Sequence, residues 1–382
     1  MSNTAPTNFL VLSSPHITQK GNTTRSIMRD VLIALIPVTL AAIYFFGYLV
    51  IVNLLVCAIA CAGFELLYTL VTTKRWTKQT IQYSSVFNLS CLVTAVILAL
   101  NLPTTVQSFV ESTGEYNGVW GLAVFFNNRV VFDLDMVILC VIASFVAIVL
   151  TKMIFGGIGK NFANPAMVGR IFLFLIVGLS AVATNPLFGL NARTSATWLQ
   201  GDKLTNPGII GNMFFGYVSS AAVGETSVIA ILLGAIYLCV KKVIDWRLPA
   251  MIIGSVAIFA LLFDVFAAKD FATYNAARSF NKMLANVLSG GLIFGAVFMA
   301  TDYSTNPNTF PGTVIFAVGI GLLTMLIRVY ANYPEGTSFA ILFMNILTPL
   351  IDKHIVPKPF GYKKQHKIKQ KVAKKAETAT AQ

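Results

Sequence analysis

The chain has 382 residues, of which 56% are hydrophobic and 11% charged, and its formal net charge is +13. About a quarter of the residues of a soluble domain are charged, so this chain has too little polar surface for a water-soluble globule. The sequence therefore predicts an all-α integral membrane protein, because its apolar runs are continuous and approach the roughly 20 residues that span a bilayer.

The positive charge does not indicate a nucleic-acid partner. The basic residues gather at predicted helix ends and in the tail from Lys353 to Lys375, where anionic membrane lipid accounts for them. The cysteines all lie in apolar runs and form no Cys-x-x-Cys pair, while the histidines stand near the chain ends. The sequence therefore predicts no metal site and no catalytic residue within this chain.

Ten apolar spans follow a polar, cytoplasmic amino-terminal segment, residues 1–30. They cover residues 31–52, 54–71, 86–102, 136–153, 171–183, 227–240, 249–266, 287–301, 313–328 and 338–351. The fifth, sixth and eighth spans are short, and short or broken helices in transport-like proteins often end at a site within the membrane. A transmembrane domain over residues 31–352 and a basic cytoplasmic tail, residues 353–382, are expected.

The distribution of basic residues predicts the orientation. With both termini inside, 21 of the 28 lysines and arginines fall on inner segments, as the positive-inside rule requires. The loop 184–226 is then extracytoplasmic. Because ten spans divide into halves of five, an odd number, the count predicts two halves of inverted orientation.

Two acidic residues lie inside predicted spans. Glu65 is in the middle of the second span, and Asp264 is near the outer end of the seventh. Ionisable residues are costly in lipid, so each is a candidate for an ion path. The alternative is that each carboxylate pairs with a basic or hydroxyl neighbour and serves the fold.

A glycine-rich polar stretch, residues 156–166, follows the fourth span. Three glycines permit close backbone packing, and Asn161 and Asn164 offer amide donors and acceptors. A planar, hydrogen-bonding ligand suits these groups, but the Asn-Pro pair is also a turn signal, and the pattern by itself favours the turn.

A hydroxyl cluster, Thr194-Ser195-Ala196-Thr197, lies in the loop 184–226. This stretch resembles the flavinylation motif of RnfD, a membrane component of the Rnf electron-transport complex, and of the related membrane component of the sodium-pumping NADH:quinone reductase. It differs from the usual motif in Ser195, where glycine is usual, and in Asn191, where aspartate is usual. Neither difference removes the acceptor hydroxyl.

The resemblance extends along the chain, and the short amino-terminal segment favours RnfD over the quinone-reductase protein. The other matching stretches are Ser14–His16, Gly156–Ala166, Phe298–Asp302, Arg328, Tyr333–Gly336, Phe339–Ala340, Asn345 and Pro349–Asp352.

The resemblance implies FMN esterified through its phosphate to Thr197, with Thr194 as the competing acceptor. We expect Arg193 to offset the phosphate charge and Trp198 to stack on the flavin ring. In the quinone reductase the corresponding asparagines contact a riboflavin, so the resemblance implies a second, non-covalent flavin at Asn161 and Asn164.

The implied function is an electron relay in a bacterial cytoplasmic-membrane complex that moves electrons between ferredoxin and NAD while translocating Na⁺ or H⁺. The implied partners are the other Rnf subunits, membrane lipid and an extracytoplasmic flavin transferase. The alternative from another class is a secondary transporter or channel without a redox cofactor, for which ten spans and buried carboxylates serve equally well.

Overall fold

The computed structural model describes residues 23–46, 49–73, 85–102, 134–182, 211, 214–215, 223–225, 227–267, 276–289, 291–331 and 336–356. Every regular element within these ranges is a helix. The predicted all-α architecture is therefore confirmed for the described part of the chain.

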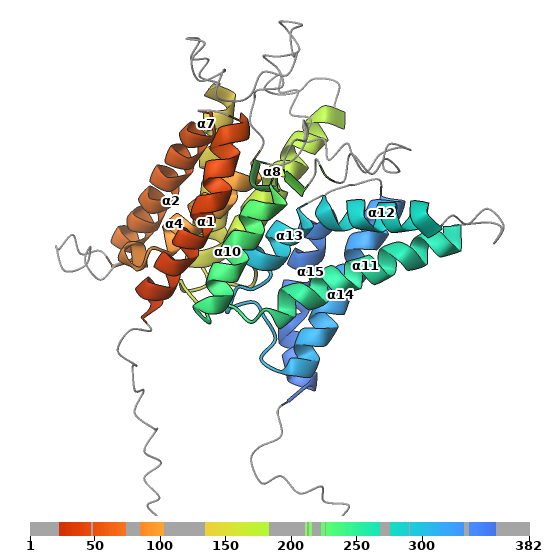
Figure 1. Ribbon diagram of the computed structural model, residues 1–382. Coiled ribbons are helices and arrows are strands. Elements are labelled where there is room, and N and C mark those ends of the chain that lie inside the picture. The colour runs from red at the N-terminus through yellow and green to blue at the C-terminus, as the bar shows by residue number, and fades with distance from the viewer. Residues whose placement is uncertain are drawn as a thin grey trace, which may run out of the picture.

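The helices form two groups in space. Figure 1 shows one group around α1, α2, α4, α7 and α10, and a second group that contains α11, α12, α14 and α15. In chain order the elements are α1 (Thr24–Phe46), α2 (Leu49–Thr73), η1 (Ser85–Asn88), α4 (Ser90–Asn101), α7 (Leu134–Phe145), η2 (Val146–Met153), α8 (Pro165–Val182), η5 (Val223–Glu225), α10 (Val228–Val240), α11 (Arg247–Ala267), α12 (Ala276–Leu288), α13 (Leu292–Phe294), η7 (Gly295–Met299), α14 (Phe310–Tyr330) and α15 (Gly336–His354).

Most of these helices have the length and composition of membrane spans. Among the described residues, α1, α2, the continuous α7–η2 segment, α11 and α14 are long and apolar enough to cross a bilayer. The α12 helix and the α13–η7 segment are together long and apolar enough to form one span, which is bent by 52°. The shorter apolar helices α4, α8 and α10, together with α15, complete a series that follows the predicted spans in order. The chain is thus a multi-pass membrane protein.

Several predicted boundaries are wrong. The first helix starts at Thr24 rather than at Val31, because the hydroxyl of Thr23 accepts a 3.2 Å hydrogen bond from the Ser26 N–H and starts the helix in polar residues. The fifth segment, α8, starts at Pro165 rather than at Ile171. The third, α4, has only 12.

The helix α12 was not predicted, because its residues were expected in an outer loop. Arg278 and Lys282 interrupt the apolar pattern there and hide an amphipathic helix. Its buried face includes Ser279 and Ala285, while Phe280 on another face is exposed. This helix packs against α11.

The two halves of the chain contain comparable helix contacts. In the first half α2 packs against α4 and α7, and in the second half α11 packs against α12 and α14. The helices α1 and α10 run antiparallel, because Asp30 and Ala34 near the start of α1 meet Tyr237 and Gly234 near the end of α10. A Cβ at Gly234 would lie 2.3 Å from the carbonyl oxygen of Ala34, so only glycine permits this approach.

The two halves also share a break in the backbone. The helix α4 begins after Leu89, and α13 begins after Gly291, and both residues adopt left-handed conformations with φ of 64° and 68°. Each half further contains a π-helix, η2 or η7, that leads into a polar loop with an Asn-Pro pair. Short π segments are frequent at functional sites.

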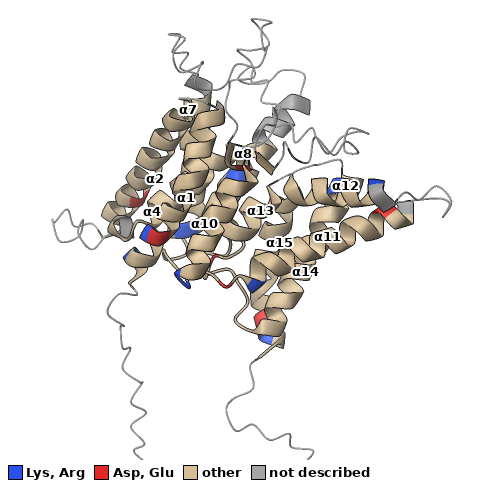
Figure 2. Ribbon diagram, viewed as in Figure 1, with Lys and Arg blue, Asp and Glu red and all other residues tan. Residues whose placement is uncertain are grey.

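Charged side chains are sparse along the helices of both groups. Figure 2 shows that most of the described helical surface carries neither Lys and Arg nor Asp and Glu. Several of the charges that lie inside the bundle form ion pairs, which are described next.

Candidate functional site

The predicted FMN-attachment cluster lies outside the described residues. This holds for Thr194, Ser195 and Thr197, and equally for Arg193 and Trp198. The roles assigned to these residues stay predictions. The other sequence-predicted site residues lie in the described part of the chain.

Glu65 is a fully buried carboxylate within α2. Lys152, in η2, donates a 2.7 Å hydrogen bond to Glu65 Oε2 and another of 2.7 Å to the hydroxyl of Ser90, the first residue of α4. The side chains of Lys152 and Glu65 are 4% and 0% exposed. Each charge depends on the other at this depth, because either one alone would leave an uncompensated buried charge.

Two of the basic residues that were counted on inner segments, Lys152 and Arg170, are buried in the bundle. Lys152 lies in η2 and Arg170 in α8. In the π-helix η2 the hydroxyl of Thr151 donates a 3.0 Å bond to the carbonyl of Val146, five residues back. The wider π turn changes the face on which Lys152 emerges, and hydrophobic periodicity does not reveal such a turn.

Asp264 is less deeply placed than Glu65. It accepts a 2.8 Å hydrogen bond from Lys282 and a second from the hydroxyl of Ser279, both on α12. The Lys282 and Asp264 side chains are 35% and 20% exposed, so water weakens their attraction. The pair nevertheless repeats, on α11 of the second half, the carboxylate–lysine contact that Glu65 makes on α2.

Asn161 and Asn164 connect the two halves. Asn164 Oδ1 accepts a 3.1 Å hydrogen bond from the Ala166 N–H and so caps α8, while its Nδ2 donates to the carbonyl of Met299 at 3.2 Å. Asn161 Nδ2 donates to the Ala163 carbonyl at 3.2 Å and lies 3.5 Å from Asp302 Oδ2. The predicted turn role is thus present, and it brings both amides to the loop that follows η7.

The glycines beside these asparagines serve the backbone conformation rather than close packing within the protein. Gly156, Gly157 and Gly159 have φ values of 107°, 90° and 83°, which other residues rarely adopt. A Cβ at Gly157 or Gly159 would meet nothing within 4 Å. The expected close approach of protein backbone is therefore wrong at these two positions.

Asp302 is the acidic residue of this polar loop. It accepts hydrogen bonds from the Ser304 hydroxyl at 3.0 Å and from the Ser304 N–H at 3.4 Å. Burial raises the pKa of the Asp302 carboxyl above its usual value, and the bonds from Ser304 and Asn161 offset part of that effect. Asp302 therefore holds a proton more readily than an exposed aspartate.

Buried polar atoms near the same loop have no hydrogen-bond partner among the described residues. They are Asn306 Oδ1 and both amide atoms of Asn345. Asn345 lies on α15 one turn before Thr348, whose hydroxyl donates to the carbonyl of Thr305 at 2.9 Å, so both asparagines flank this loop. Buried groups without partners are rare unless a ligand or water satisfies them. Asn306 and Asn345 are therefore candidate contacts for a ligand or water.

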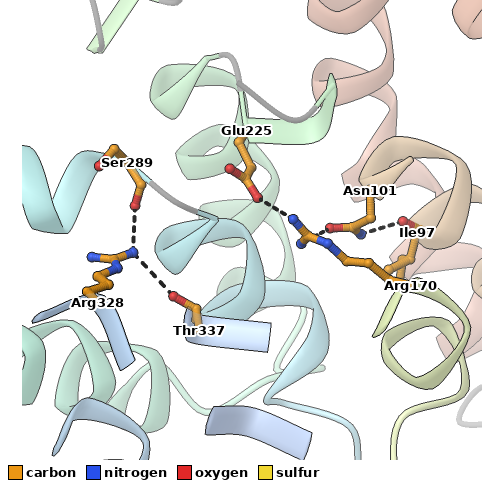
Figure 3. Close-up of polar contacts among 7 residues, drawn as sticks. All are labelled: Ile97, Asn101, Arg170, Glu225, Ser289, Arg328 and Thr337. Carbon is orange, nitrogen blue, oxygen red and sulfur yellow. Dashed lines mark hydrogen bonds and ion pairs between the residues drawn. The ribbon is translucent and has the colours of Figure 1, made fainter. Parts of the chain in front are cut away.

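A second buried ion pair was not predicted from the sequence. Arg170 donates a 2.7 Å hydrogen bond to Asn101 Oδ1 and lies 3.4 Å from Glu225 Oε1, as Figure 3 shows. The Arg170 and Glu225 side chains are 8% and 6% exposed. The only sequence signal was an arginine just inside an apolar run, since Glu225 was assigned to the outer loop.

Arg328 contacts the end of α12, next to the break between α12 and α13. It donates a 2.6 Å hydrogen bond to the carbonyl of Asn286. It also donates a 3.0 Å hydrogen bond to the carbonyl of Ser289 and lies 3.3 Å from the hydroxyl of Thr337, as Figure 3 shows. These carbonyls stand at the carboxyl end of α12, where a cation is favourable. The arginine therefore stabilises the bent α12–α13 pair.

Buried charge pairs beside helix breaks, in a bundle of membrane spans, are typical of membrane proteins that move ions. Membrane proteins that move ions or protons use such pairs and broken helices, whereas an anchor has no use for them.

The chain belongs to the NQR2, RnfD, RnfE family. The family's model matches residues 10–122 and 135–361, so the match covers nearly the whole chain and includes the three charge pairs described above and the predicted attachment cluster. The resemblance inferred from the sequence is confirmed.

Curated relatives, each the D-subunit of its complex, match over almost their full lengths. The relative from the Na(+)-translocating ferredoxin:NAD(+) oxidoreductase complex of Acetobacterium woodii is 34% identical over 94% of this chain and 96% of the relative. The relative from the proton-translocating ferredoxin:NAD(+) oxidoreductase complex of Clostridium ljungdahlii is 31% identical, over 92% and 96%. The relative from the ion-translocating oxidoreductase complex of Actinobacillus succinogenes is 31% identical, over 93% and 98%.

Proposed function

We propose that this chain is the flavin-carrying membrane subunit of an ion-translocating ferredoxin:NAD oxidoreductase complex. The observation that carries the proposal is the full-length similarity to the corresponding subunits of such complexes. A transporter or channel without a redox cofactor would have no reason to resemble them from end to end.

The ion-translocating part of the proposal rests on Glu65. Its carboxylate and the Lys152 ammonium are buried together, and Ser90 supplies a further oxygen to the same ammonium. A buried carboxylate that already holds a cation is suited to exchange it for Na⁺ or H⁺. We place Glu65 on the ion path, and Asp264, with its more exposed lysine partner, at a more accessible point of the path.

The redox part of the proposal rests on Thr197 and the two asparagines. FMN supplies electron transfer that no side chain of this composition provides. Thr197 would hold FMN through a phosphoester, with Arg193 beside the phosphate and Trp198 beside the ring. Asn161 and Asn164 would contact a riboflavin, and the unpartnered Asn345 and Asn306 are nearby acceptors and donors for the same ligand.

The proposed location is the bacterial cytoplasmic membrane, with both termini cytoplasmic and the loop 184–226 outside. The proposed partners are the other subunits of the complex, which must bind ferredoxin and NAD because this chain carries neither an iron–sulfur cysteine set nor a dinucleotide fingerprint. A transferase on the outer face must attach the FMN. Membrane lipid would cover the exposed apolar side chains of the helices, which include Leu40, Ile59 and Val240.

The test is to isolate the whole complex from membranes and measure ferredoxin-dependent NAD reduction and flavin content together. The proposal expects this subunit to co-purify with activity and with bound flavin. A colourless subunit that purifies alone and transports solutes without electron transfer would overturn it.

A further inference from the structure

The turn between α10 and α11 carries basic side chains on the surface of the protein. Lys241, Lys242 and Arg247 are exposed, and Trp246 beside them is 64% exposed. Figure 2 shows basic residues at the end of α10 and at the start of α11. Because both helices are apolar, the turn lies at the level of the lipid headgroups when the chain is in a membrane.

Lys242 occupies a position where glycine is usual. Its φ is 56°, in the left-handed region. The N–H of Lys242 donates to the carbonyl of Cys239 at 3.0 Å, and the N–H of Val243 donates to the carbonyl of Leu238 at 2.9 Å, which is the pattern of a helix end closed by glycine. A lysine is strained in this conformation and a glycine is not. Local stability therefore does not explain the lysine, and its exposed ammonium group is a reason to keep it.

The other two cations of the turn lie over aromatic rings. Lys241 Nζ is 5.9 Å from the centre of the Tyr237 ring, and the Arg247 guanidinium carbon is 5.9 Å from the centre of the Phe310 ring. Such contacts hold a cation in place without removing its charge. The turn thus presents positive charge next to apolar surface.

The acidic side chains near the turn leave it positively charged. The segment 241–247 contains three basic residues and one acidic residue, Asp245, so its net charge is +2. Asp245 Oδ1 accepts a 3.1 Å hydrogen bond from the N–H of Arg247 and so caps the start of α11. Asp30, on the neighbouring helix α1, lies 4.0 Å from Arg29, which balances its charge. The turn therefore favours an anionic partner.

An apolar stripe on α10 leads to these cations. Leu233, Ile236 and Val240 are each more than half exposed, and their spacing of three and four residues places them on one face of the helix. Val240 immediately precedes Lys241. A molecule that contacts this whole surface needs a long apolar part joined to an anionic head.

We propose that the turn between α10 and α11 is a binding site for an anionic phospholipid. The lipid phosphate lies among the Lys241, Lys242 and Arg247 side chains, and an acyl chain lies along the stripe on α10, with Trp246 at the headgroup level. A soluble protein would reach the cations but not a stripe within the bilayer, whereas a lipid matches both. This inference goes beyond the proposed function and requires only that the chain spans a membrane.

The experiment measures lipid contact through the fluorescence of Trp246. The full chain is placed in nanodiscs of phosphatidylcholine that contain a minor share of brominated phosphatidylglycerol, or the same share of brominated phosphatidylcholine. Bromine quenches tryptophan on contact, and subtraction of the signal of Trp246→Phe isolates Trp246 from the other tryptophans. We expect brominated phosphatidylglycerol to quench Trp246 more strongly than brominated phosphatidylcholine. Equal quenching by the two lipids would overturn the inference.

The decisive variant is Lys242→Gly, because it removes the charge and also relieves the strained backbone, so the fold is retained. It should lower the preference for phosphatidylglycerol by about fivefold, the share expected of one basic residue at an anionic surface. Lys242→Arg should keep the preference. An unchanged preference in Lys242→Gly would contradict the proposed site.

The matched control is Lys353→Gln, which removes an exposed charge from the end of another helix, α15. The preference should stay at the wild-type value. An equal loss in Lys353→Gln would mean that the net charge of the chain attracts the lipid, and the site at the turn would then be wrong.

Two further measurements distinguish other occupants. Excess glycerol phosphate, at constant ionic strength, should leave the quenching by phosphatidylglycerol unchanged, and displacement by it would assign the turn to free phosphate compounds instead. The difference between the two brominated lipids should also persist in the whole complex. Its disappearance there would show that another subunit covers the turn, and a lipid would not be the occupant.

Discussion

Lys152 donates a 2.7 Å hydrogen bond to Glu65, although the two residues stand 87 positions apart in the chain. This contact joins η2 to α2 and reaches α4 through Ser90. It gives the buried carboxylate a partner that the sequence did not disclose, and it makes the pair the first target for mutation.

Replacing Glu65 by glutamine should lower cation uptake by vesicles that contain the whole complex, because the amide cannot exchange a bound cation. Unchanged uptake with unchanged electron transfer would remove Glu65 from the ion path. The stability of the purified subunit provides a second readout. Lys152→Met should cost about 3–5 kcal/mol, because it leaves Glu65 buried and unpaired. The double variant Glu65→Gln/Lys152→Met should recover part of this loss.

Asp264→Asn should reduce cation uptake less than Glu65→Gln does, because the Asp264–Lys282 pair is partly exposed and water can replace one partner. The effect on the free energy of unfolding should be about 1 kcal/mol or less, as for other partly exposed pairs. The comparison requires both variants in the same vesicle assay. A larger loss of uptake in Asp264→Asn would reverse the proposed order of the two carboxylates.

Alanine at both Asn161 and Asn164 should lower the non-covalent flavin content of the purified complex. Because Asn164 caps α8, the double variant should also lose about 1 kcal/mol of stability. The control is Asn308→Ala, in the corresponding loop of the second half, which removes an exposed amide bonded to Asp352. Flavin stoichiometry equal to that of the wild type would leave the two asparagines as turn residues only.

Asp302 should make the fold less stable as pH rises. Its pKa is higher in the folded chain than in the unfolded chain, so the folded state binds its proton to higher pH. The contribution of Asp302 to stability is therefore present below its usual pKa and is lost as pH rises through the folded pKa. Thermal unfolding should show that Asp302→Asn gains stability relative to wild type as pH rises above the usual pKa of an aspartate.

Much of the fold followed from the sequence because membrane helices carry a strong hydropathy signal. The order of the spans was predictable on this basis. The helix α12 was not predicted, because Arg278 and Lys282 interrupt the apolar pattern of its sequence. The start of α1 at Thr24 was also hidden, since apolar runs do not mark a helix that begins in polar residues.

The candidate sites were predictable only in part. Glu65 was identified because a carboxylate within an apolar run is costly. Its partner could not be predicted, because η2 is a π-helix and the position of the Lys152 side chain therefore does not follow from α-helical periodicity. Glu225 was not predicted as a site residue, because the sequence pattern placed it in a loop. Its burial depends on tertiary contacts with Arg170 and Gly291, which no local pattern encodes.

Fluorescence of the denatured chain tests the central claim, that this subunit carries a covalent flavin, most directly. The protein is made with its flavin transferase, denatured, separated on a gel and viewed under ultraviolet light, alongside Thr197→Ala and Thr194→Ala. The account predicts a fluorescent band in the wild type and in Thr194→Ala, and no band in Thr197→Ala. A band that persists in Thr197→Ala, or no band in the wild type, would contradict it.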